Sequence, residues 1–148
     1  TVVSSSYATI ESIKAADQLM KERKISIELI DLRQLSPLKI NKIITSVKKT
    51  QRLLVLDTGH ESGSISGDII LKVLSKFNGF KTLPRRLCIP DYPEPTSRGL
   101  LANYHVDAKK IFAACIEIVQ NPNQGKRKFY GREKLALDVP GPWFSGPF

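Results

Sequence analysis

The stretch Leu53-Leu54-Val55-Leu56-Asp57 places four large apolar residues in a row and ends on an acid. Successive side chains of a strand point to opposite faces of a sheet, so a strand that is apolar throughout has to be covered on both faces. Strands of this kind lie in the middle of parallel sheets, between two layers of helices. The stretch therefore predicts the central strand of an α/β fold.

Helical patterns stand on both sides of this strand. Upstream, apolar residues recur at helical spacing over residues 40–47, and Ser36-Pro37 predicts the start of that helix because Ser favours the N-cap and Pro the first turn. Downstream, the apolar spacing over residues 65–77 predicts a second helix. By the same patterns, further helices are expected at residues 7–20 and 107–119, and further strands at 2–3, 25–32 and 86–90.

Strands and helices thus alternate along residues 1–120. This alternation requires crossovers between parallel strands, and it predicts a three-layer α/β/α domain with a mostly parallel sheet of about five strands. Residues 121–148 differ, because they hold four of the nine prolines and four of the nine glycines and have little periodicity. We therefore expect one α/β domain over residues 1–120, followed by a Pro- and Gly-rich tail that is basic and aromatic.

The formal net charge of +9 raises the question of a nucleic-acid partner. The basic residues are dispersed among acids, and the one cluster, Lys126-Arg127-Lys128, is followed by two aromatic residues. Such a cluster could hold phosphates and stack a base, but it is more typical of a segment that docks on an acidic partner surface. No apolar run approaches the roughly 20 residues of a membrane span. We expect neither nucleic acid nor membrane as a partner.

Cysteine usage and the chain start bear on the compartment. Cys88 and Cys115 both lie inside apolar runs, which favours buried, reduced thiols. The first residues lack the basic flank and apolar segment of a signal peptide. The scattered Cys and His residues have no metal-ligand spacing. These observations predict a cytoplasmic protein without a metal site.

The best candidate for binding chemistry follows the central strand, since ligands of α/β sheets gather beyond the carboxyl ends of the strands. Its glycines allow close backbone approach, the following helix start favours an anion, and its His and Glu could act as acid and base. The motif matches neither the phosphate-binding loop, the dinucleotide fingerprint nor the nucleophile elbow. We predict an anion or interface loop, or else a tight strand-to-helix turn. The candidate residues are Asp57, Gly59, His60, Glu61, Ser62 and Gly63.

The tail carries a second candidate surface. Three large aromatic residues, Trp143, Phe144 and Phe148, lie in a segment with no helical or strand period. Such a segment cannot build its own core, and leaving each aromatic group in water forfeits roughly 1.5–3 kcal/mol. We expect residues 138–148 to lie as a strap across this domain or a second subunit, with Lys126-Arg127-Lys128 steering the tail toward an acidic partner.

Four segments carry a family resemblance: Asp31-Leu32-Arg33-Gln34-Leu35-Ser36-Pro37-Leu38, Ser46-Val47-Lys48-Lys49-Thr50 with the strand at 53–57, Ser62-Gly63-Ser64-Ile65-Ser66-Gly67-Asp68-Ile69, and Pro90-Asp91-Tyr92-Pro93-Glu94-Pro95-Thr96-Ser97. In order and spacing they resemble the C-terminal domain shared by transketolase, deoxyxylulose-phosphate synthase and the β-subunits of 2-oxo acid dehydrogenases. The resemblance covers about residues 1–119 and is nearest to the dehydrogenase β-subunits, such as that of pyruvate dehydrogenase. It implies the α/β fold in its transketolase C-terminal form.

The resemblance also implies a function. In this family thiamine diphosphate and Mg²⁺ are held between other domains, so it assigns no catalytic residue and no bound cofactor to this chain, and the isolated domain is expected to be inactive. It implies subunit association within an oxidoreductase or a transferase. The implied partners are a pyrimidine-binding domain, upstream or on another chain, an α-type subunit and an acyltransferase core, in a dimer. The residues leave one alternative open, a free-standing module that binds a small anion or nucleotide at Asp57–Gly63.

Overall fold

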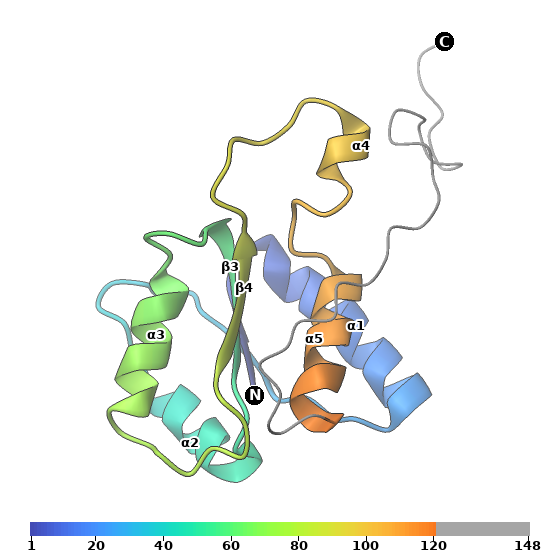
Figure 1. Cartoon of the computed structure of the whole chain (residues 1–148). Helices are drawn as coiled ribbons and strands as arrows, with labels where there is room; N and C mark the ends of the chain where they lie inside the picture. The colour runs from blue at the N-terminus through green and yellow to red at the C-terminus, as the bar shows by residue number, and fades with distance from the viewer. Residues whose placement is uncertain (121–148) are drawn as a thin grey trace.

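The structure is a computed structural model, and it describes residues 1–120 (Figure 1). Strands and helices alternate along these residues, with a short extra helix before the last one. In chain order the elements are β1 (Val2–Ser4), α1 (Tyr7–Arg23), β2 (Leu29–Asp31), α2 (Asn41–Thr50), β3 (Leu54–His60), α3 (Ile65–Leu74), β4 (Arg85–Ile89), α4 (Arg98–Leu101) and α5 (Ala108–Gln120).

The four strands of the described part form one sheet in the order β2-β1-β3-β4, and every pair is parallel. β3 lies between β1 and β4, with Val55 opposite Val3 and Leu56 opposite Leu87. This confirms the expected α/β class and the interior place of residues 54–57. The strand count is one below the approximate five that the sequence suggested.

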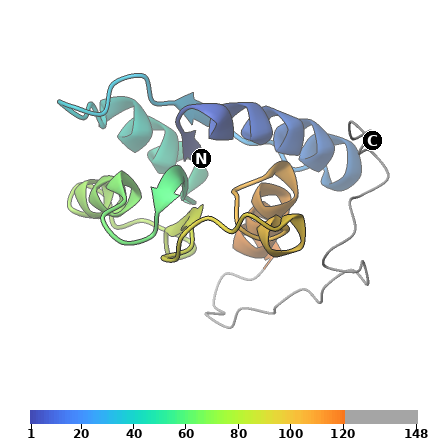
Figure 2. The ribbon, with the colours of Figure 1, turned by 90° about the horizontal axis from the view of Figure 1, so that it is seen from above.

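Two helix layers cover the sheet, α1 and α5 on one face and α2 and α3 on the other (Figure 2). Successive side chains of the central strand point to opposite faces of the sheet, and both helix layers pack on them. Leu54 and Leu56 belong to the core under α1 and α5, while Leu53 and Val55 belong to the core under α2 and α3. All four side chains are at most 3% exposed. The run of apolar residues is therefore used on both of its faces, as its pattern requires.

The predicted helix start at Ser36-Pro37 is wrong. The chain turns at residues 35–38, and α2 begins only at Asn41. The sheet order explains this difference, because β1 lies between β2 and β3. Residues 32–40 have to carry the chain past β1, and on the way Leu32 and Leu38 pack against the core.

Two strand boundaries also differ from the expectation. Of residues 25–32 only Leu29–Asp31 form a strand, while Ile25 and Ile27 pack against the core as irregular chain. The central strand does not stop at Asp57 but runs to His60, since His60 pairs with Ile89 across the sheet. Within residues 1–120, no helix has the length and apolar character needed to cross a bilayer.

Candidate functional site

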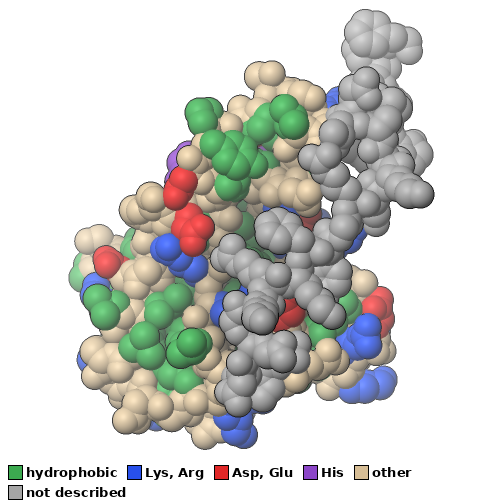
Figure 3. Space-filling model, viewed as in Figure 1, with side chains coloured by type: hydrophobic (Ala, Val, Ile, Leu, Met, Phe, Trp, Pro, Cys, Tyr) green, Lys and Arg blue, Asp and Glu red, His purple; other side chains and the backbone are tan. Residues whose placement is uncertain are grey.

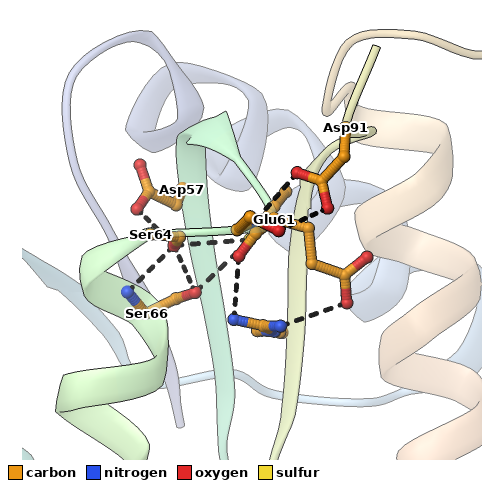
Figure 4. Close-up of polar contacts among 8 residues, drawn as sticks. Asp57, Glu61, Ser64, Ser66 and Asp91 are labelled. Atoms are coloured by element: carbon orange, nitrogen blue, oxygen red, sulfur yellow. Dashed lines mark hydrogen bonds and ion pairs between the residues drawn. The ribbon is translucent and has the colours of Figure 1, made fainter.

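The carboxyl ends of β3 and β4 bring the loop of residues 57–63 against the start of α3 and the residue that follows β4 (Figure 4). Asp57 is the anchor of this region. Its Oδ1 accepts a hydrogen bond from the Gly59 amide at 3.0 Å, and its Oδ2 accepts one from the Ser64 hydroxyl at 2.6 Å. Both oxygens of the carboxylate are thus bonded within the chain.

Ser64 is the N-cap of α3, and its Oγ accepts a hydrogen bond from the Ser66 amide at 3.0 Å. The Ser66 hydroxyl lies 2.5 Å from Ser64 Oγ and 3.3 Å from the Sγ of Cys88 on β4. One donor at the helix start is therefore satisfied by a side chain. The same two hydroxyls tie α3 to β4.

Glu61 is held by Arg86, which extends from β4. Arg86 Nη1 donates to the Glu61 carbonyl oxygen at 3.1 Å, and Nη2 lies 3.3 Å from Oε1 of the Glu61 carboxylate. The Glu61 amide donates to the carbonyl oxygen of Ile89 at 3.0 Å. To act as an acid or a base, the Glu61 carboxylate would first have to separate from Arg86.

Asp91 closes the loop from the other side. Its Oδ1 accepts a hydrogen bond from the Ser62 amide at 2.8 Å, and its Oδ2 accepts one from the Ser62 hydroxyl at 2.7 Å. These bonds to the ionised form hold the pKa of the Asp91 carboxyl below its usual range. Next to it, His60 Nδ1 lies 2.8 Å from the carbonyl oxygen of Pro90.

The geometry is that of a hydrogen-bonded clamp between two strand ends and a helix start. Asp57, Glu61 and Asp91 bring three carboxylates to the loop against the one cation that contacts them in the described part of the chain, Arg86, and this excess of negative charge is unfavourable for an anion. Gly63 takes a positive φ of 75°, which is the one position in the loop where the backbone itself favours glycine. The arrangement does not favour the small-anion or nucleotide alternative, while a role of the loop in an interface stays a prediction.

The sequence predicted the loop, but the predicted site residues left out three that hold it, Ser64, Arg86 and Asp91. The available signal was positional, because the ends of neighbouring parallel strands meet at one edge of a sheet. Asp91 follows the end of β4, and the loop after β3 begins at the same edge of the sheet. Asp91 and Arg86, however, contact Ser62 and Glu61, which lie 29 and 25 residues away in the chain, and no local pattern encodes such contacts.

The remaining candidates from the sequence fall in two groups. Cys88 and Cys115 are both free, and Cys88 is half-buried, whereas burial raises the pKa of the Cys115 thiol to about 11. Within residues 1–120, no group of three or more His, Cys, Asp or Glu side chains could hold a metal ion. The tail candidates lie outside the described residues; they are Lys126, Arg127, Lys128, Trp143, Phe144 and Phe148.

Residues 1–120 thus form a parallel α/β/α domain in which internal hydrogen bonds close the ends of β3 and β4. Comparison with known proteins makes this more specific. A family model described as "Transketolase, C-terminal domain" matches residues 1–111. The chain belongs to this family, which confirms the resemblance seen in its motifs.

Curated relatives agree with this assignment. The β-subunit of acetoin:2,6-dichlorophenolindophenol oxidoreductase from Bacillus subtilis (strain 168) is 37% identical over 75% of this chain and 32% of its own length. The mitochondrial pyruvate dehydrogenase E1 β-subunit of Chaetomium thermophilum is 34% identical over 68% of this chain and 26% of its own length. The corresponding B. subtilis subunit is 43% identical over 43% of this chain and 19% of its own length. The chain spans about a third or less of the length of these relatives.

Proposed function

We propose that this chain is the C-terminal assembly domain of a thiamine-diphosphate-dependent 2-oxo acid dehydrogenase β-subunit or transketolase-like enzyme, and that it does not catalyse a reaction alone. The family match over residues 1–111 carries the proposal. The relatives named above are β-subunits about three or more times as long as the matched segment. The chemistry of such a protein would then reside in parts that this chain does not supply.

The site geometry supports a non-catalytic role. A site for thiamine diphosphate and Mg²⁺ needs free acidic or amide oxygens for the metal and cationic or amide donors for the diphosphate. The described loop does not fit this group, because both oxygens of Asp57 and of Asp91 accept hydrogen bonds within the chain and the Glu61 carboxylate is paired with Arg86. We therefore propose that the cofactor and Mg²⁺ bind elsewhere in the complete enzyme.

The proposed partners follow from the proposal that the cofactor binds elsewhere in the complete enzyme. They are a pyrimidine-binding domain, an α-type subunit and, in a dehydrogenase complex, an acyltransferase core. The proposed domain boundary lies at about residue 120, the last residue of α5 that the structure describes. Residues 121–148 would form a tail that contacts a partner.

A domain exchange tests the proposal. Residues 1–120 would replace the matching segment of the acetoin:2,6-dichlorophenolindophenol oxidoreductase β-subunit of B. subtilis, and the chimera would be coexpressed with that enzyme's α-subunit carrying an affinity tag. The proposal expects the chimera to be retained by the tagged subunit as the natural β-subunit is. A β-subunit truncated before the segment is the matched control, and it should be lost.

Retention of the truncated β-subunit at the same level as the chimera would contradict the assembly role.

Calorimetric titration of the 148-residue chain with thiamine diphosphate and Mg²⁺ tests the proposal that the cofactor binds elsewhere. Binding at roughly micromolar Kd would overturn the statement that the cofactor site lies elsewhere.

A further inference from the structure

In the described domain, basic residues gather at the C-terminal ends of three helices. Helices that connect parallel strands run opposite to them, so the C-terminal ends of α1, α2 and α3 lie at the amino end of the sheet (Figure 1). Their last turns carry basic residues, Lys21 and Arg23 in α1, Lys48 and Lys49 in α2, and Lys72 in α3. Cations at these positions complement the helix dipole.

Exposed lysines stand in the last turns of α2 and α3 and in the chain that follows α3. Val47 and Val73 belong to the same buried cluster, so the ends of both helices cover one core. The Lys81 amide donates to the carbonyl oxygen of Gln51 at 2.9 Å, so the connection from α3 to β4 passes below the end of α2. We call the exposed residues Lys48, Lys72, Lys76 and Lys81 the basic α2–α3 surface.

These four lysines have no acidic partner within residues 1–120. Lys49 beside them is different, since its Nζ lies 3.4 Å from the Glu28 carboxylate. The acid of α3, Asp68, lies in the first turn of that helix, about two turns from Lys76. The positive charge of the basic α2–α3 surface is thus uncompensated by its own domain.

Apolar side chains accompany these lysines. On the outer side of α3, Leu71 is 67% exposed and Leu74 is 43% exposed, and Leu83 in the following connection is 85% exposed. Figure 3 shows hydrophobic side chains gathered over α3 on this side of the molecule. A single exposed leucine is common on protein surfaces, but three beside unpaired lysines form a mixed surface of the kind that partners cover.

We propose that the basic α2–α3 surface, together with Leu71, Leu74 and Leu83, binds an acidic amphipathic segment of a partner protein. The proposal rests on the assembly role proposed above and adds the surface and the partner's chemistry. Carboxylates of the partner would pair with the lysines, and its apolar side chains would cover the leucines. Charge complementarity would set the orientation and speed association, while apolar burial would supply affinity.

The residue types favour a protein over a membrane or a nucleic acid. Membrane-surface helices use Trp or Phe to enter the lipid, but the aromatic rings here, Phe77 and Phe80, pack edge-to-face and against the core. Nucleic-acid surfaces stack bases on aromatic rings and use Arg forks, whereas the last turns of α2 and α3 carry lysines and no arginine. A lysine is a point charge that pairs readily with a carboxylate.

The test uses the 148-residue chain and a synthetic helical peptide of about 18 residues, with Glu on one face and Leu on the other. Binding is followed by fluorescence anisotropy of a labelled peptide. One variant carries Lys72→Gln, Lys76→Gln and Lys81→Gln. Its matched control carries Lys21→Gln, Arg23→Gln and Lys24→Gln, which remove the same charge from the end of α1. Gln keeps helix propensity, and circular dichroism melting confirms that each variant folds.

The proposal expects the first variant to raise the peptide's Kd about tenfold or more and the control to change it less than about twofold. Leu71→Ser with Leu74→Ser should also weaken binding. Equal effects of the two charge variants would overturn the proposal, as would no measurable peptide binding. Tighter binding to phosphatidylserine vesicles or duplex DNA than to the peptide would overturn it as well. If the chimera assembles and the peptide does not bind, this inference fails while the assembly role stands.

Discussion

Asp57 shows how a single residue at a strand end can serve structure in place of chemistry. It lies in the carboxyl-terminal half of β3, close to the edge of the sheet where ligands of α/β proteins gather. In this domain its two oxygens instead satisfy the Gly59 amide and the Ser64 hydroxyl. Position alone therefore could not separate a catalytic from a structural carboxylate, because the difference lies in the partners.

Replacing Asp57 with Ala tests this role. The change leaves the Ser64 hydroxyl and the Gly59 amide without their acceptor in a partly buried place, so we expect a loss of about 1–3 kcal/mol in the free energy of unfolding. Urea denaturation measures the loss. Asp17→Ala, at an exposed position on α1, is the control and should change stability by less than about 0.5 kcal/mol. Equal stability of the two variants would show that the clamp at Asp57 contributes nothing.

The bond between Asp91 and Ser62 should make stability depend on pH. The pKa of Asp91 is lowered from its ordinary value of 3.8 because Ser62 donates two hydrogen bonds to the ionised form. A lowered folded-state pKa contributes stability that is present above the ordinary value and lost as pH falls through the folded-state pKa. We expect the stability difference between the natural chain and Asp91→Asn to shrink below about pH 4. A difference that stays constant down to about pH 2 would contradict this assignment.

Among the elements, β3 was the most predictable and the connections around it the least. Four apolar residues in a row were enough to place β3 inside the sheet, since only two-sided coverage accommodates Leu53 to Leu56. The start of α2 was not predictable from Ser36-Pro37, because the chain first has to pass β1. Likewise, Asp57 gave no sign that β3 continues to His60, which depends on pairing with Ile89.

The central place of β3 predicts a severe effect of Val55→Asp. Val55 is fully buried between β1, β4 and the helices α2 and α3, so the change would bury a charge without a partner and cost several kcal/mol. Thermal melting followed by circular dichroism checks this. The control is Ile13→Asp on α1, where the side chain is 52% exposed and little change is expected. A soluble Val55→Asp variant that melts cooperatively near the natural temperature would contradict the prediction.

At the scale of the described domain, residues 1–120 bury two clusters of apolar residues, one on each face of the sheet. The family and the α/β class could be predicted from motifs at 31–38, 46–57 and 90–97, because their order reflects the succession of strands and helices. The identity of a partner could not be predicted from these motifs, because it depends on the surface that the folded helices form together.

The tail remains a prediction from the sequence. Removing residues 138–148 should expose the surface that Trp143, Phe144 and Phe148 are expected to cover, and it should lower the melting temperature or the molecular mass in light scattering. The fluorescence of Trp143 in the full chain should be that of a ring shielded from water. Water-like Trp143 emission, together with an unchanged mass and melting temperature after the deletion, would rule out the strap.

The proposed role of this domain in subunit association can be measured as the light-scattering mass of the chimeric β-subunit. With residues 1–120 in place of the natural segment, we expect twice the mass of one chimeric chain, as a symmetric dimer gives. The truncated β-subunit should have the light-scattering mass of a single chain. A monomeric, folded chimera, or a truncated subunit that still forms the dimer, would contradict the association role.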